Sequence, residues 1–263
     1  MTISVIIPVY NSSEWVEACL ESLAAQDFKD FEILAVDDHG QDDSMEKVRR
    51  FAAQHPEISL KCLATERNSG PGEARNVGIR NAAGEYVIFI DADDTVSPHM
   101  LGRMLGKARE EGAEMACCQA LQIFPDGRRK LLENPPYRSK RQFLMHYVGG
   151  VWNGWLVKSE LVRRCGLQFP PFHASEDSAF AGAAILMANR VACVAEPLYN
   201  YLIHSQSVSQ KKDNAKAAQK RAAFRWLIGF AKEKGVYDAN RCALGWLYLK
   251  KAVLVPLAEQ ILG

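Results

Sequence analysis

Apolar stretches alternate with segments of helical spacing over the first 120 residues of the chain. The run Ile3–Val9 is almost continuously apolar, which is typical of a strand that is covered on both faces of a sheet. The same pattern predicts three further strands, at 31–36, 58–63 and 86–90. Such alternation predicts an α/β fold, in which helices flank a mostly parallel, Rossmann-like sheet.

Capping residues predict where two of the helices begin. Asn11, with Glu14 three residues later, is the expected start of the first helix. Ser97 and Pro98 are the expected N-cap and first residue of a later one.

The pattern is less regular after residue 120. Pro125-Asp126-Gly127 predicts a hairpin turn between strands at 120–124 and 129–132. The other elements expected here are helices at 141–148 and 177–189 and short strands at 191–194 and 198–203. From Lys212 onward the pattern is helical, with a second segment over 238–261. We therefore expect a domain over residues 1–210 and a small helical extension over 211–263.

Charge distinguishes the extension from the rest of the chain. Residues 211–263 contain 11 Lys and Arg residues and 4 Asp and Glu residues. Residues 1–210 contain 21 Lys and Arg residues and 27 Asp and Glu residues. A basic extension on an acidic domain predicts contact with something anionic, such as a membrane surface. A solvated helical face explains the same composition equally well.

The overall composition is that of an ordinary soluble globular protein, 48% hydrophobic and 24% charged over 263 residues. No stretch resembles a signal peptide or a membrane span. The seven cysteines form no C-x-x-C pair, so we expect buried thiols in a reducing compartment and no structural zinc. These features predict a cytoplasmic protein.

Polar clusters follow three of the predicted strands. They are Pro8-Val9-Tyr10-Asn11, Asp37-Asp38 and Asp91-Ala92-Asp93-Asp94. Because ligands of open parallel sheets bind at the carboxyl ends of the strands, we expect the three clusters to meet in one cleft. Tyr10 offers a ring on which a base can stack, and Asp38 a carboxylate that can accept from a base N–H. Packing of Tyr10 and helix capping by Asp38 are the alternatives.

The three carboxylates after the fourth predicted strand favour a cation. Two like charges about 4 Å apart cost about 4 kcal/mol at an effective dielectric constant of about 20. Oxygen ligands alone favour Mg²⁺ or Mn²⁺, which would also offer positive charge to a bound phosphate. The alternative is a solvated acidic turn that caps the helix at Ser97.

A glycine-rich segment joins the third predicted strand to the next helix. Gly70 permits a tight turn and a close approach of the backbone, and Arg67 and Arg75 are candidates to contact a base or a phosphate. The segment does not match the G-x-G-x-x-G dinucleotide pattern.

Several of these motifs resemble those of the family 2 inverting glycosyltransferases, which have the GT-A fold. The matching segments are 5–11, 36–38, 68–79 and 90–94, together with Glu176-Asp177-Ser178-Ala179-Phe180, Tyr199-Asn200-Tyr201 and Ser207-Val208-Ser209. The resemblance covers about residues 1–210, and it depends on these motifs occurring in the family's order.

The resemblance implies a role for individual residues. It implies that Asp177 is the general base, with Glu176 shaping the site, and that Asp93 binds the metal bridging the diphosphate. Trp152 would line the acceptor or donor-sugar pocket. The residues expected at the nucleotide are Pro8, Tyr10, Asn11, Asp38, Arg67, Gly70, Arg75 and Asp91.

Two histidines depart from the family pattern. His39 follows the Asp pair where Gly-Ser is more usual, which leaves the shape of that loop open. His204 stands where an arginine is common, and either contacts the diphosphate, completes the metal shell or is structural.

The expected function is the transfer of a sugar from a nucleotide diphosphate sugar to a hydroxyl acceptor with inversion. The resemblance implies a UDP-sugar as the donor, because UDP-sugars are usual in the family. Saccharide or lipid-linked acceptors would place the enzyme in polysaccharide or glycolipid synthesis, with a peripheral contact of 211–263 at the inner face of the membrane. A nucleotidyltransferase is the first alternative, although Tyr10-Asn11-Ser12 occupies the place of its basic glycine-rich loop. The second is a catalytically inactive protein that binds nucleotide sugars.

Overall fold

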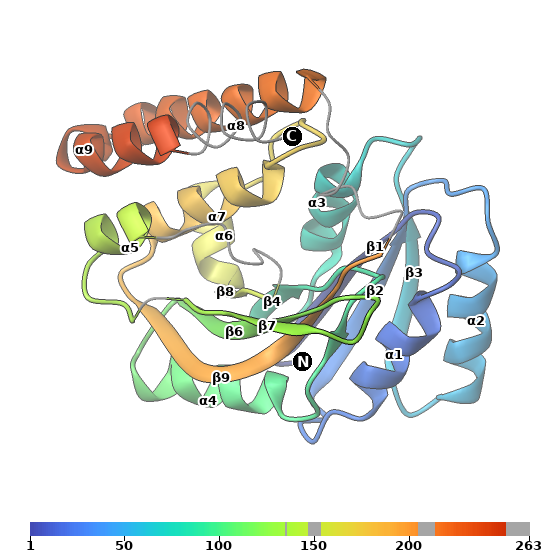
Figure 1. Ribbon diagram of the computed structural model, residues 1–263. Coiled ribbons are helices and arrows are strands. Elements are labelled where there is room, and N and C mark those ends of the chain that lie inside the picture. The colour runs from blue at the N-terminus through green and yellow to red at the C-terminus, as the bar shows by residue number, and fades with distance from the viewer. Residues whose placement is uncertain (135, 147–153, 205–213, 251–263) are drawn as a thin grey trace.

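A curled sheet of nine strands forms the centre of the computed structural model, which describes residues 1–134, 136–146, 154–204 and 214–250 (Figure 1). The strands are β1 (Ile3–Val9), β2 (Phe31–Asp37), β3 (Ser59–Ala64), β4 (Tyr86–Phe89), β5 (Thr95–Val96), β6 (Met115–Ile123), β7 (Arg129–Leu132), β8 (Leu156–Lys158) and β9 (Val191–Leu202). The helices are α1 (Val16–Ala24), α2 (Ser44–Gln54), α3 (Pro71–Asn81), α4 (Met100–Glu110), α5 (Lys140–His146), α6 (Ser159–Cys165), α7 (Glu176–Met187), α8 (Asn214–Glu233) and α9 (Tyr237–Tyr248).

The order of the strands brings the polar clusters of the sequence to one edge. The sheet runs β3-β2-β1-β4-β8-β6-β9-β5, and β7 pairs with β6. The first four strands in this order are parallel, so β1, β2 and β4 end at the same edge as neighbours. β8 is antiparallel to both β4 and β6, and β9 is parallel to β6. The predicted α/β sheet flanked by helices is therefore confirmed.

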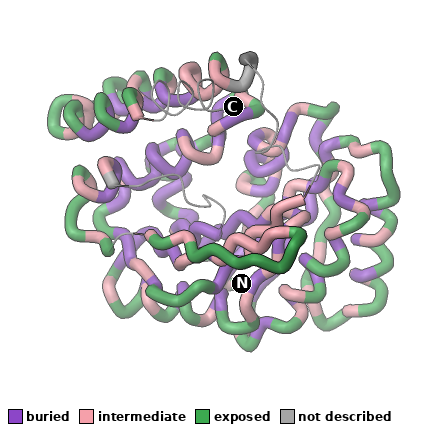
Figure 2. The backbone as a smooth tube through the Cα atoms, in the orientation of Figure 1, coloured by how far each residue is buried: buried purple, intermediate pink, exposed green. Residues whose placement is uncertain are grey.

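Two apolar clusters cover the two faces of the sheet. One contains the inner faces of α1, α2 and α4, and the other contains apolar residues of α3 and of α5 to α9. Figure 2 shows buried residues concentrated in the central strands and in the facing sides of the helices, whereas the turn after β6 and most of β7 are exposed. Because the centre of the sheet is covered on both faces, β1, β2 and β4 are buried at nearly every position, as the sequence indicated, whereas the edge strand β3 is mostly exposed.

Local structure differs from the prediction in four places, one of which is the start of α4: the helix begins at Met100 with His99 as N-cap, not at Pro98 with Ser97 as N-cap. Asn11 does not start α1: its backbone is left-handed, at φ 46°, and its Oδ1 accepts from the Gln41 N–H at 2.7 Å, so the helix begins after Trp15. The two short strands expected after residue 190 are one strand, β9, whose register against β6 shifts beside Gln119. The short elements β5, β8 and α6 are absent from the prediction, because they carry too few residues for a periodic pattern.

The first C-terminal helix, α8, packs on α7 in the second cluster. Leu227 of α8 lies against Gly182 of α7, where any larger residue would place its Cβ 2.7 Å from the leucine Cδ2. α9 in turn packs against α8 and α5. The ends of the helices expected at 141–148 and 238–261 lie outside the described residues, from 147 and from 251. Among the residues described, no helix combines the length and the apolar character that a membrane crossing requires.

Candidate active site

Three carboxylates meet in the turn that follows β4, the acidic turn of residues 91–94. One oxygen from each of Asp91, Asp93 and Asp94 lies within 4.8 Å of the other two. Asp94 is buried, and it accepts hydrogen bonds from the Tyr199 hydroxyl at 2.6 Å and the Leu202 N–H at 2.9 Å. It therefore holds β9 against the acidic turn, whereas the other two side chains are partly exposed, 26% for Asp91 and 31% for Asp93.

His204 brings the end of β9 to the second acid of the turn. Its Nε2 lies 2.9 Å from Oδ2 of Asp93, and its side chain is 15% exposed. Burial, and next the Asp91 charge, raise the pKa of Asp93 above its ordinary value, although His204 opposes the shift. The pKa of Asp94 is raised more strongly, by burial and by the charges of the other two acids. The turn thus carries negative charge that a cation would stabilise.

The buried guanidinium of Arg75 joins the acidic turn to α7. Its Nη2 lies 2.6 Å from Oδ1 of Asp91, and its Nη1 lies 3.0 Å from Oε1 of Glu176. Burial alone would lower the pKa of Arg75, but Asp91 and Glu176 outweigh it and raise the pKa. The ring of Phe169 lies 5.3 Å from the guanidinium carbon. The guanidinium of Arg75 therefore forms ion pairs with two acidic motifs that are more than 80 residues apart in sequence.

Glu176 and Asp177 begin α7, where acids are favoured by the helix dipole. Burial, and next the Asp177 charge, raise the pKa of Glu176 to about 7, although Arg75 opposes the shift. Burial also raises the pKa of Asp177, against the opposing charge of Arg75. Ser175, directly before them, has a left-handed backbone at φ 64°. A carboxylate with a raised pKa is a better proton acceptor than an ordinary one.

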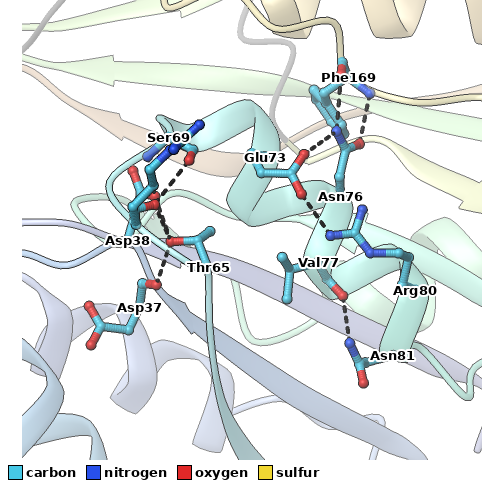
Figure 3. Close-up of polar contacts among 11 residues, drawn as sticks. Asp37, Asp38, Thr65, Ser69, Glu73, Asn76, Val77, Arg80, Asn81 and Phe169 are labelled. Atoms are coloured by element: carbon cyan, nitrogen blue, oxygen red, sulfur yellow. Dashed lines mark hydrogen bonds and ion pairs between the residues drawn. The ribbon is translucent and has the colours of Figure 1, made fainter.

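Asp38 organises the glycine-rich turn between β3 and α3. Its Oδ1 accepts from the Thr65 hydroxyl and the Ser69 N–H, both at 2.9 Å, and its Oδ2 accepts from the Gly70 N–H at 2.8 Å. Figure 3 shows Asp38 against Thr65 and Ser69 at the start of this turn. The turn is thereby fixed to the end of β2, beside the end of β1.

The remaining residues expected at the nucleotide lie around the same edge. Tyr10 is 47% exposed, and Pro8 is half-buried on β1 beside Val36 of β2. Asn11 lines a pocket of about 210 Å³ with acidic residues of the loop before α2. Arg67 is exposed and lines a second pocket, of about 410 Å³, with Ser69 and Arg80. Trp152 lies outside the described residues, and the roles assigned to all these side chains stay predictions.

Three contacts in this region were not expected from the sequence. Tyr199 belongs to a recognised motif, but its bond to Asp94 becomes visible only when β9 is placed beside the turn. Trp15 stacks on His204 although it lies in a segment that the sequence assigned to the interior of α1. Gln219 of α8 accepts from the His173 N–H at 3.1 Å, which brings the C-terminal helices to the loop before α7.

The parallel half-sheet, the acidic turn and the Glu-Asp pair together define a GT-A type fold with a candidate nucleotide-sugar site. The sequence profile described as glycosyl transferase family 2 matches residues 4–155. The chain belongs to this family.

Curated relatives and solved structures agree with this assignment. The chain is 29% identical over 221 residues to the uncharacterized glycosyltransferase YibD of Escherichia coli K12, covering 79% of this chain and 63% of that protein. It is 30% identical over 209 residues to a poly(ribitol-phosphate) beta-glucosyltransferase of Bacillus spizizenii, covering 77% of this chain and 32% of the relative. The chain thus spans less than two thirds of the length of these relatives.

The fold is also that of solved glycosyltransferases. Staphylococcus aureus TarS 1–349, in complex with UDP-GlcNAc, matches with a TM-score of 0.70 and 24% identity, over 87% of this chain and 66% of that one. The mannosyltransferase PcManGT of Pyrobaculum calidifontis, in complex with GDP-Man and Mn²⁺, matches with a TM-score of 0.63 and 20% identity. The match covers 98% of this chain and 75% of that one. These structures show a GT-A architecture for this chain.

Proposed function

We propose that this chain transfers a sugar from a nucleoside diphosphate sugar to a hydroxyl group of an acceptor, with inversion at the anomeric carbon. The contact of Arg75 with both Asp91 and Glu176 carries the proposal, because it connects the acidic turn to the Glu-Asp pair through one buried cation. A donor diphosphate at the acidic turn would then lie on the same side of the sheet as the proposed base.

The acidic turn has the donor set for a divalent cation, Mn²⁺ or Mg²⁺. The proposed ligands are Asp93 and His204, whose Oδ2 and Nε2 lie 2.9 Å apart. The raised pKa of Asp93 supports this, since a carboxylate crowded by other acids is stabilised by a cation. When bound, the cation would supply the positive charge that the leaving diphosphate requires. Asp91 is proposed to contact the ribose, and Asp94 stays with β9.

Asp177 is the proposed general base. It would accept the proton of the acceptor hydroxyl while that oxygen attacks the anomeric carbon and the nucleoside diphosphate departs from the opposite face. One displacement of this kind inverts the anomeric centre. Glu176 and Arg75 would hold the start of α7 in place, because their ion pair is buried directly beside the base.

The base and ribose of the donor are proposed to lie against the ends of β1 and β2. Tyr10 supplies an exposed ring for stacking, and the turn fixed by Asp38 supplies backbone close to the same edge. Pro8, Asn11, Arg67 and Gly70 complete the proposed nucleotide contacts. Uridine is the proposed nucleoside, which the UDP-GlcNAc complex of the TarS structure supports by analogy.

The acceptor is proposed to be a saccharide or a lipid-linked intermediate of cell-surface polysaccharide synthesis, because the relatives include a poly(ribitol-phosphate) beta-glucosyltransferase and a succinoglycan biosynthesis protein. Residues 1–210 would form the catalytic domain, and the basic extension 211–263 would contact anionic lipid. Trp246 on α9 and Leu249 directly after the helix are 43% and 42% exposed, and Arg241 and Lys250 lie before and after them in the sequence. An exposed tryptophan with flanking cations suits a membrane surface.

Nucleotide release from a panel of UDP-, GDP- and TDP-sugars, with and without Mn²⁺, tests the proposed reaction. A glycosyltransferase releases a nucleoside diphosphate in the presence of an acceptor. A nucleotidyltransferase would instead release pyrophosphate from a nucleoside triphosphate and a sugar phosphate. An inactive binding protein would shift its melting temperature with a donor but release no nucleotide.

Asp93→Asn tests the metal site within this proposal. The variant is expected to lose metal-dependent turnover by at least about a hundredfold while it keeps its fold, because the side chain is partly exposed and makes no structural bond like those of Asp94. Asp126→Asn, in the exposed hairpin turn, is the control. Full activity of Asp93→Asn would remove the metal assignment.

A further inference from the structure

Trp15 covers one face of the His204 ring. The centroids of the two rings lie 3.9 Å apart, with 27° between their planes. The other contact of this imidazole at the acidic turn is made by its edge, where Nε2 meets Oδ2 of Asp93 at 2.9 Å. One aromatic face and one carboxylate therefore constrain the same ring in two perpendicular directions.

The position of Trp15 is itself fixed by its neighbours. The backbone N–H of Trp15 donates to the Ser12 carbonyl at 2.9 Å, and the backbone N–H of Ser12 donates to Oγ of Ser44 at 2.8 Å. One turn further along α1, the Cys19 thiol lies 3.5 Å from the carbonyl oxygen of Asp91. The start of α1 is thus tied to α2 and to the acidic turn, which fixes the backbone of Trp15 relative to the carboxylates.

This arrangement decides where the imidazole nitrogen points. The second side-chain torsion of a histidine is broad, so the ring alone would sample many orientations. Flat stacking removes the rotations that tilt the ring, and those that remain keep the imidazole in one plane. In that plane, Nε2 faces Asp93. Residues that hold a liganding histidine in this way tune metal affinity although they never touch the metal.

We propose that Trp15 is a positioning residue for His204, which it orients toward the cation held at Asp93. The inference rests on the proposed metal site and adds to it the residue that directly precedes α1. Trp15 acts through the imidazole, because its ring stacks on the His204 ring.

A double-mutant cycle on Mn²⁺ binding tests this role without any need for a substrate. Binding of Mn²⁺ alone is followed by the loss of the electron paramagnetic resonance signal of the free ion. The four proteins are the wild type, Trp15→Met, His204→Ala and the double variant. Methionine fills apolar volume without a flat ring, so α1 is expected to stay packed. Trp15→Phe restores a flat ring, and Trp246→Leu, on the exposed face of α9, is the matched control.

Trp15→Met is expected to weaken Mn²⁺ binding about tenfold, and Trp15→Phe less than about threefold. In the His204→Ala background, Trp15→Met is expected to cause no further change, because the ring through which it acts is gone. Trp246→Leu should bind as the wild type does.

Three outcomes would overturn the inference. Unchanged Mn²⁺ affinity of Trp15→Met, with His204→Ala weakened, would reject the role of Trp15 and leave the metal site in place. An equal loss from Trp15→Met with and without His204 would show that the indole acts through packing of α1 instead. If the wild type binds no Mn²⁺, or His204→Ala binds it unchanged, the metal site assigned to His204 fails and the role of Trp15 with it.

Discussion

The carboxylate of Asp177 is half-buried at the start of α7, and burial raises its pKa. If it accepts the acceptor proton, Asp177→Asn should lower kcat by about 10² to 10⁴-fold, the usual contribution of a general base. Binding of UDP and Mn²⁺, followed by thermal shift, should persist because the amide keeps the shape of the side chain. A variant with near wild-type kcat would require a different base.

Glu176 predicts a specific dependence of stability on pH. Its pKa is raised from 4.5 to about 7 in the folded protein, so the folded state binds this proton more tightly than the unfolded state does. The contribution of Glu176 to the free energy of unfolding therefore falls as the pH rises from about 4.5 to about 7. Glu176→Gln cannot lose a proton, so it should gain stability relative to the wild type between pH 5 and pH 8.

Urea unfolding of both proteins at pH 5, 6, 7 and 8 measures this difference. The Glu114→Gln variant is the control, because Glu114 is also buried and paired, with Arg164, but lies on the loop before β6. A constant difference between Glu176→Gln and the wild type across this range would contradict the raised pKa.

At the scale of elements, the glycine-rich turn depends on Gly70 for two reasons. Its backbone is left-handed at φ 86°, and a Cβ there would lie 2.5 Å from Nδ1 of His173. Gly70→Ala should therefore destabilise the fold by about 1–3 kcal/mol and shift the turn that Asp38 anchors.

Gly106→Ala is the matched control for this substitution. Gly106 lies in α4 with no atom within 4 Å of the added Cβ, so alanine should stabilise the protein by about 0.5–1 kcal/mol. Denaturant unfolding of both variants measures the two free energies of unfolding, which should fall for Gly70→Ala and rise for Gly106→Ala. Equal effects would mean that the turn tolerates a side chain at residue 70.

Strands and helices with many periodic positions were predictable from the sequence, and short or long-range features were not. Ile3–Val9 was predicted with its observed bounds, because a strand buried on both faces is apolar throughout. β8 has three residues and offers no period to detect. The positions of the acidic clusters followed from strand ends, but the contact of Arg75 with Glu176 depends on how α3 and α7 meet. No spacing in the sequence encodes that contact.

At the scale of the whole molecule, α8 packs on α7 and α9 packs on α8 and α5, and the apolar side chains of Trp246 and Leu249 stay exposed at the end of α9. If this face contacts lipid, Trp246→Ser with Leu249→Ser should reduce binding to vesicles of phosphatidylethanolamine and phosphatidylglycerol at least about tenfold, because two large apolar side chains would no longer be buried. Co-sedimentation at low ionic strength measures the bound fraction.

Leu131→Ser is the control for this pair, since Leu131 is 44% exposed but lies on β7, a strand paired only with β6 among the described residues. Vesicle binding that is equal for all three proteins would leave the extension without a role at the membrane.

The bonds of Asp94 to Tyr199 and Leu202 have a consequence for any mutational scan of the acidic turn. Asp93 is partly exposed and can be changed with local effects, whereas Asp91 also pairs with the buried Arg75. Asp94 secures β9, which ends two residues before His204. A neutral residue at 94 would release that strand and displace the histidine, so the resulting loss of ion affinity would be a folding defect rather than evidence of direct coordination. Such a scan therefore identifies ligands only when the secondary structure of each purified variant is measured as well.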